Sequence, residues 1–186
     1  MRDLARELIP HAPELGLFVA PDIPPDRLRN AIRDYAPAIS AEDVLALYDA
    51  TLLRNAKDGA VFTATGFTFQ NNDLEAPQTI AYADIVSVEA EKKLLGGRRV
   101  HVAVNRGRAT LDLVMDFSGR PGAARYVVEF LSEAMMAGVT LRGEVGAEMG
   151  EGFETDLAAV RAALRKLHAD RVLSSGDLRR LLDALG

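Results

Sequence analysis

The stretch that decides the fold is VHVAVNRGRATLDLVM, residues 100–115. Valines alternate with other residues in its first half, and leucines and a methionine alternate in its second half. Strict alternation is typical of a strand that is buried on one face, and Arg106-Gly107 between the halves is a turn dipeptide. The stretch therefore predicts an antiparallel hairpin whose apolar rows share one face. The pairs expected to lie opposite one another are Asn105 with Arg108, Val102 with Leu111, and His101 with Asp112.

Short runs of β-branched and aromatic residues precede this hairpin. They are separated by dipeptides that tolerate positive φ, namely Asp58-Gly59, Thr65-Gly66 and Gly96-Gly97. The runs predict further strands at Ala60–Thr65, Gly66–Asn71, Gln78–Tyr82 and Ile85–Ala90.

A helical period begins after the hairpin. Between Arg120 and Met136 apolar residues recur three and four positions apart and form one broad stripe. Gly138 is expected to end this helix. A stripe this wide needs a partner, and we expect the helix to pack on the open face or end of the strand unit.

The N-terminal part is expected to lead into the strands. Its proline density makes Pro10–Pro25 an extended or looped arm. A helix is predicted at about Pro25–Ala36, ended by Pro37. Ser40 and Asp43 form a capping-box pattern, which predicts a second short helix. The apolar side of that helix would consist of Val44, Leu45, Leu47 and Tyr48.

The C-terminal part reads as a linker and a pair of helices. Residues 138–153 are rich in glycine and have little periodicity, which predicts a flexible linker, although Val139–Val145 could form one more strand. Leucine seams predict two helices in 154–186, with Ser174 capping the second. Because two isolated helices this short are marginal alone, they are expected to dock on each other, on the strand unit or on a second copy of the chain.

This order of short strands followed by one helix resembles the pleckstrin-homology-like fold of the bacterial type. The resemblance is carried by DGAVFT at 58–63, GFTF at 66–69, IAYADI at 80–85 and the helix from Arg120 to Met136. It implies an interaction scaffold, sometimes oligomeric, and not an enzyme. The loop Arg54–Gly59 lacks the dense basic cluster of phosphoinositide binders. The tail is similar to the short helix pairs appended to many bacterial proteins.

Composition bounds the class of protein. The 186 residues are 48% hydrophobic and 26% charged, which suits one globular domain with decorations or two small ones. No apolar run approaches the roughly 18 residues that span a bilayer, and the N-terminus has no apolar signal segment. The absence of cysteine excludes disulfides and favours a reducing cytoplasm, here of a bacterium. The net charge of −5 argues against a nucleic-acid partner.

We therefore expect an α+β chain in which a pleckstrin-homology-like antiparallel β-barrel or sandwich is capped by a C-terminal helix. The expected parts are a proline-rich arm and helical lead-in (1–46), the strand unit with its capping helix (47–137), the glycine-rich linker (138–153) and the C-terminal helix pair (154–186).

A basic run is the one anomaly of charge. It begins at Lys92 and ends at Arg108, it includes Arg106, and no acidic residue lies among its cations. Leucines at the predicted hairpin tip stand between these cations, a mixture that suits a protein partner or an anionic bilayer. The alternative is a solvated hairpin without a binding role, whose leucines pack back onto the core. The candidate interaction residues are Lys92, Lys93, Leu94, Leu95, Arg98 and Arg99.

His101 and Asp112 are the one histidine–carboxylate pair that the sequence places together. Both are expected to point to solvent, so we expect an exposed pair that raises the pKa of His101 modestly. A pocket that held both residues would instead indicate a small-molecule enzyme. The histidines are too far apart for a metal site, and the glycine pairs lack the order of a phosphate loop.

The sequence thus favours a non-enzymatic protein-interaction or scaffold module, without cofactor or metal, that binds a protein partner or itself. The alternative is peripheral binding to an anionic membrane surface through the Lys92–Arg99 hairpin.

Overall fold

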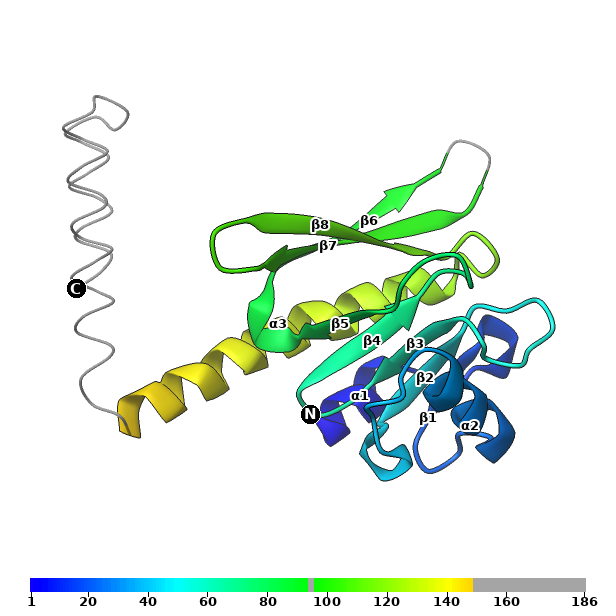
Figure 1. Ribbon diagram of the computed structural model, residues 1–186, viewed down its shortest axis with the longest axis horizontal. Coiled ribbons are helices and arrows are strands. Elements are labelled where there is room, and N and C mark those ends of the chain that lie inside the picture. The colour runs from blue at the N-terminus through cyan, green and yellow to red at the C-terminus, as the bar shows by residue number, and fades with distance from the viewer. Residues whose placement is uncertain (94–95, 149–186) are drawn as a thin grey trace. The chain divides into compact units, whose positions relative to one another are not determined.

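Two antiparallel sheets and a long helix dominate the fold, as Figure 1 shows. The computed structural model describes residues 1–93 and 96–148. The chain divides into a unit of Met1–Thr140, which contains both sheets, and a unit of Leu141–Gly186. The predicted helix pair at 154–186 lies outside the described residues.

The strands fall into two sheets, ordered β1-β2-β3-β4-β5 and β6-β7-β8, rather than one closed barrel. The α+β class is therefore confirmed in its coarse form. The helices are α1 (Arg2–Leu8), α2 (Pro25–Asp34) and α3 (Ala123–Glu148), with 3-10 turns η1 (Pro13–Leu15), η2 (Ala41–Asp43) and η3 (Tyr82–Asp84). The strands are β1 (Leu17–Val19), β2 (Ala46–Asp49), β3 (Gly59–Phe62), β4 (Gly66–Gln70), β5 (Gln78–Ala81), β6 (Ile85–Lys92), β7 (Arg98–Asn105) and β8 (Thr110–Asp116).

Strands β1 to β4 of the five-stranded sheet are buried on both faces, whereas β5 is buried only at Ile80. Alternate residues of β2 separate into two cores, since Tyr48 belongs to the large core shared with the second sheet and α3, whereas Leu47 belongs to a smaller core under α2. Phe62 joins the large core and Val61 the small one, so β3 alternates in the same way. A strand covered on both faces carries a continuous apolar run instead of an alternating one.

This double burial explains why the helix predicted after Ser40 is wrong. Residues 41–43 form only the 3-10 turn η2, and the apolar run that follows is β2, paired with β1 and β3. A short continuous apolar run is compatible with a buried helix or a buried strand, and periodicity cannot separate them. The proline-rich arm likewise contains strand β1, and helix α1 precedes it.

The hairpin of β7 and β8 is confirmed, but its predicted register is wrong by two residues. Asn105 lies opposite Thr110, Val102 opposite Leu113, and Ala103 opposite Asp112. The turn is longer than predicted, with the Arg106 amide donating to the Ala109 carbonyl at 2.8 Å. Because the shift is an even number of residues, the apolar rows stay on the same face.

Helix α3 packs on the large core as predicted. The ring of Phe130 meets those of Phe62 and Tyr82 edge to face at 5.5 and 5.8 Å, and burial of such a side chain stabilises the fold by roughly 1.5–3 kcal/mol. The predicted helix end at Gly138 is wrong, because α3 continues to Glu148. The expected linker is therefore helical over its first part.

Gly138 serves a different purpose from the one predicted. A Cβ at this position would lie 2.9 Å from the Ala83 amide nitrogen and 3.1 Å from the Tyr82 carbonyl carbon. The glycine thus lets the backbone of α3 approach η3 closely, and a single glycine inside a long helix costs only about 1 kcal/mol relative to alanine.

Candidate interaction site

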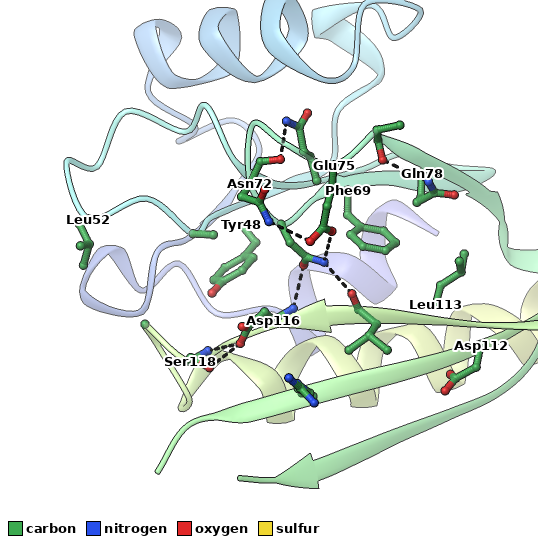
Figure 2. Close-up of a pocket in the computed structure, with 17 residues that line it drawn as sticks. Tyr48, Leu52, Phe69, Asn72, Glu75, Gln78, Asp112, Leu113, Asp116 and Ser118 are labelled. Atoms are coloured by element: carbon green, nitrogen blue, oxygen red, sulfur yellow. Dashed lines mark hydrogen bonds between the residues drawn. The ribbon is translucent and has the colours of Figure 1, made fainter. Parts of the chain in front are cut away.

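A cleft of about 850 Å³ opens between the two sheets, beside the loops 50–58 and 71–77. Strand β8 forms one side of it, and the end of β4 with the 71–77 loop forms the other (Figure 2). Tyr48, Phe69 and Leu113 supply apolar surface, and Asn71, Glu75 and Asp116 supply polar groups. A concave apolar surface with a few placed polar groups is the usual form of a binding site.

The apolar floor of the cleft is formed by buried aromatic rings. Tyr48 stacks on Phe117 with ring centroids 4.6 Å apart, and Tyr48 and Phe69 are each only 3% exposed. Burial raises the pKa of Tyr48 well above its ordinary value, so its hydroxyl stays protonated. In Figure 2 that hydroxyl points into the gap between the loops and β8.

The two loops beside the cleft carry unusually exposed leucines. Leu52 in the 50–58 loop lines the cleft and is 91% exposed, and Leu74 in the 71–77 loop is 97% exposed. Leu53 beside Leu52 is similarly exposed. Large apolar side chains held in water next to a concave surface mark an interaction site. The sequence does not predict these exposed leucines, because leucines in turn-rich segments carry no periodic signal.

A buried polar cluster braces the base of the 50–58 loop. Asp49 has no exposed surface, and one carboxylate oxygen accepts from the amide and hydroxyl of Thr51 at 2.9 and 2.5 Å. Arg27 lies 3.4 Å from the other oxygen. Arg120 donates to the carbonyl oxygens of Asp49 and Thr51. These bonds satisfy the buried charge and hold the loop that presents Leu52.

The 71–77 loop is braced by its own side chains and by β8. Glu75 accepts from the amides of Asn71 and Asn72 at 2.9 and 2.8 Å. Asn71 also donates to the Val114 carbonyl at 2.8 Å and accepts from the Asp116 amide at 2.9 Å. The side chain of Asn71 therefore joins the loop to the backbone of β8, as the dashed bonds in Figure 2 indicate.

The basic hairpin is less positive in space than in sequence. Lys93 lies 3.1 Å from Asp116 and 2.5 Å from the Ser118 hydroxyl. Partial burial raises the pKa of Asp116, but hydrogen bonds from Ser118 and Lys93 outweigh it and hold the pKa below its ordinary value. Arg99 pairs in register with Glu91 on one side and with Asp116 on the other. Leu94 and Leu95 lie outside the described residues.

Lys92 and Arg98 remain as cross-strand neighbours near the tip of the hairpin. Lys92 is exposed, Arg98 is half-buried, and neither makes an ion pair with any residue that the structure describes. The basic run has no acidic residue within it in the sequence. In the folded sheet, however, Glu91 of β6 and Asp116 of β8 lie beside its cations.

His101 contacts Asp112 as predicted, although the two residues are not directly opposite. Its Nδ1 lies 2.9 Å from Asp112 and its Nε2 lies 3.2 Å from Glu91. The hydrogen bond with Asp112, and then that with Glu91, raises the pKa of His101. Asp112 borders the cleft but His101 does not, so the cleft does not hold the pair.

Within residues 1–93 and 96–148, no cluster of histidine and carboxylate side chains could hold a metal ion. None of the helices in this part of the chain is long and apolar enough to cross a bilayer. Comparison of the chain with protein-family models, with curated proteins and with solved structures finds no match.

Proposed function

We propose that this protein is a non-enzymatic interaction module that holds a segment of a partner protein in the cleft between β8 and the 71–77 loop. The observation that carries the proposal is the apolar cleft of about 850 Å³ with the exposed Leu52 in its lining. A location in the cytoplasm of a bacterium is part of this proposal, and the absence of cysteine supports the reducing compartment.

The polar groups of the cleft favour binding over catalysis. Glu75 is engaged by asparagine amides, Asp116 by Lys93 and Ser118, and Asp112 by His101. The cleft does not hold the His101–Asp112 pair, and the carboxylates of Glu75 and Asp116 accept hydrogen bonds that fix the loops and the hairpin. Apolar anchors surrounded by satisfied polar groups suit a protein interface.

The element order supports the further proposal that the strand unit is pleckstrin-homology-like. Strands β2 to β5 form a consecutive meander, β6 to β8 form a second one, and α3 follows. Strand β1 would then be an addition at the edge beside β2. Such an arrangement is consistent with a scaffold role.

The proposal is tested by selecting a displayed library of random linear peptides on the intact protein. We expect enrichment of peptides rich in apolar residues over an unrelated folded protein. The variant Leu52→Ser should weaken their binding about tenfold, because Leu52 lines the cleft and a bound peptide would bury its side chain. Leu52 is 91% exposed in the free protein, so the variant should fold normally.

Val86→Ser is the matched control, because Val86 is 54% exposed and does not line the cleft. Its peptide affinity should equal that of the wild type. A selection that enriches no peptide, or peptides that bind Leu52→Ser as tightly as the wild type, would overturn the proposal.

Attachment to an anionic membrane is the second candidate. Leu52 and Leu53 precede Arg54 in one exposed loop. Lys93 of the basic hairpin donates to Ser118, and Arg120 donates to the Thr51 carbonyl, so the 117–122 segment connects this loop to the hairpin. Exposed leucines beside cations suit a bilayer surface. Flotation with anionic vesicles, lost in Arg98→Glu/Arg99→Glu and weakened by salt, would support this function. Equal behaviour with neutral and anionic vesicles would reject it.

A further inference from the structure

Strand β8 is the last strand of its sheet, and its outer edge borders the cleft. One edge of β8 pairs with β7 along its whole length. On the other edge, the hydrogen bonds from the described residues come from the Asn71 side chain, which bonds the Val114 carbonyl and the Asp116 amide. Because backbone groups of an antiparallel strand point to alternate sides, the N–H and C=O groups of Thr110 and Asp112 and the N–H of Val114 also point to the outer edge.

The side chain of Asn71 makes the two hydrogen bonds to β8 that a backbone residue of a neighbouring parallel strand would make. A residue in a parallel strand donates to the carbonyl of one residue and accepts from the amide two positions further along. The carboxamide of Asn71 does both, to Val114 and to Asp116. One position of a missing parallel strand is thus occupied by a side chain.

The outer edge of β5, the last strand of the five-stranded sheet, is likewise bonded by a side chain. The Thr79 carbonyl of β5 accepts from the Arg106 guanidinium at 2.9 Å. Side chains, and not a backbone ladder, therefore cover the outer edges of β5 and β8 among the described residues. Covering an open edge with polar side chains is a recognised means of preventing unwanted strand pairing.

We infer that the partner segment binds as an extended strand added in parallel to β8, and that it displaces Asn71 to do so. This inference rests on the proposed function. Alternate side chains of the added strand would point toward Leu113 and Phe69, so they are apolar. The intervening side chains would lie on the face of Asp112, which favours lysine or arginine opposite that carboxylate. Glu75 can keep one hydrogen bond to Asn71 after the displacement.

The test measures how the selected peptides bind to variants of the intact protein. Asn71→Ala removes the group that competes for β8, so it should tighten peptide binding roughly tenfold while lowering the thermal stability of the free protein. Asn72→Ala is the matched control. Its amide bonds Glu75 and its oxygen accepts from Leu74 within the same loop, and it makes no bond to β8, so peptide affinity should not change.

A second variant blocks the edge itself. Val114→Pro removes a donor that points away from β7, so the ladder of β7 and β8 stays intact while peptide affinity falls at least tenfold. In the wild type, the Val114 amide should become protected from hydrogen exchange when peptide binds. Peptides that bind with full affinity to Asn71→Ala and Val114→Pro alike would overturn strand addition and leave the proposed function standing. A selection that yields no peptide would overturn both.

Discussion

The imidazole of His101 lies between two carboxylates, and this arrangement makes its protonation a measurable property of the second sheet. Asp112→Asn removes the larger cause of the raised pKa, so the pKa of His101 should fall. It should remain above the ordinary value, because Glu91 still accepts from Nε2. An NMR titration of the His101 ring protons against pH measures both values directly.

Glu89→Gln is the control for this titration. Glu89 lies directly opposite His101 in the sheet but makes no hydrogen bond to the ring. Its removal should change the pKa of His101 less than Asp112→Asn does. A pKa that is the same in wild type and Asp112→Asn would contradict the pairing.

The raised pKa also sets the direction of a stability change. The folded protein binds the His101 proton more tightly than the unfolded chain does, so the pair stabilises the fold below the unfolded pKa of about 6.5. The contribution is lost as the pH rises through the folded pKa. It should be small, roughly 0–1 kcal/mol, because both carboxylates are more than half exposed.

Single residues differ in how well the sequence predicts them. His101 and Asp112 could be paired because both belong to one hairpin and share a face even when the register slips by two. Lys93 could not be paired with Asp116, because the contact depends on the turn lengths of the hairpin. The exposed leucines of the 50–58 and 71–77 loops could not be predicted either, since no local pattern distinguishes an exposed leucine from one that packs on the core.

The contact between α3 and η3 gives a prediction about a single element. Gly138→Ala should stabilise an isolated helix by about 1 kcal/mol. In the folded protein the added Cβ would lie 2.9 Å from the backbone nitrogen of Ala83, so α3 or η3 must shift. We expect a net loss of about 1–3 kcal/mol in the free energy of unfolding, measured by urea denaturation.

Gly119→Ala is the comparison for this prediction. The nearest atom to a Cβ at Gly119 is the Ala50 carbonyl oxygen at 3.8 Å, an ordinary contact. This variant should change the free energy of unfolding by less than about 0.5 kcal/mol. If Gly138→Ala were as stable as wild type or more so, helix propensity would govern the site and the close packing on η3 would not.

Elements with a clear period are the ones that the sequence predicts well. The alternation of β7 and the stripe of α3 each reflect burial on one face, and both elements are confirmed. Strand β8 is also confirmed as a strand, but only Met115 in it is buried. The run Val44–Tyr48 has no period because it is buried on both faces, so it was mistaken for a helix. The end of α3 was misplaced because glycine marks close packing as well as helix termini.

The cleft belongs to the arrangement of both sheets and could not be read from the chain. Its floor combines β2, β4 and β8, and its sides are brought together by the bond between Asn71 and Val114. None of these contacts is local in sequence. Sequence reasoning placed the candidate site on the Lys92–Arg99 hairpin because a charge run is visible without a structure, whereas an open strand edge is not.

The self-association proposed for residues 154–186 can be tested by removing that segment. Both sheets and the large core lie within Met1–Thr140, so a chain that ends at residue 153 should keep its strand content by circular dichroism. Its melting temperature should stay within about 4 °C of the full chain, a change of less than 1 kcal/mol. Light scattering should show a larger assembly for the full chain and a monomer for the shortened one. Equal masses for the two chains would exclude residues 154–186 as the contact between copies. The cleft would then remain as the proposed surface for binding a partner.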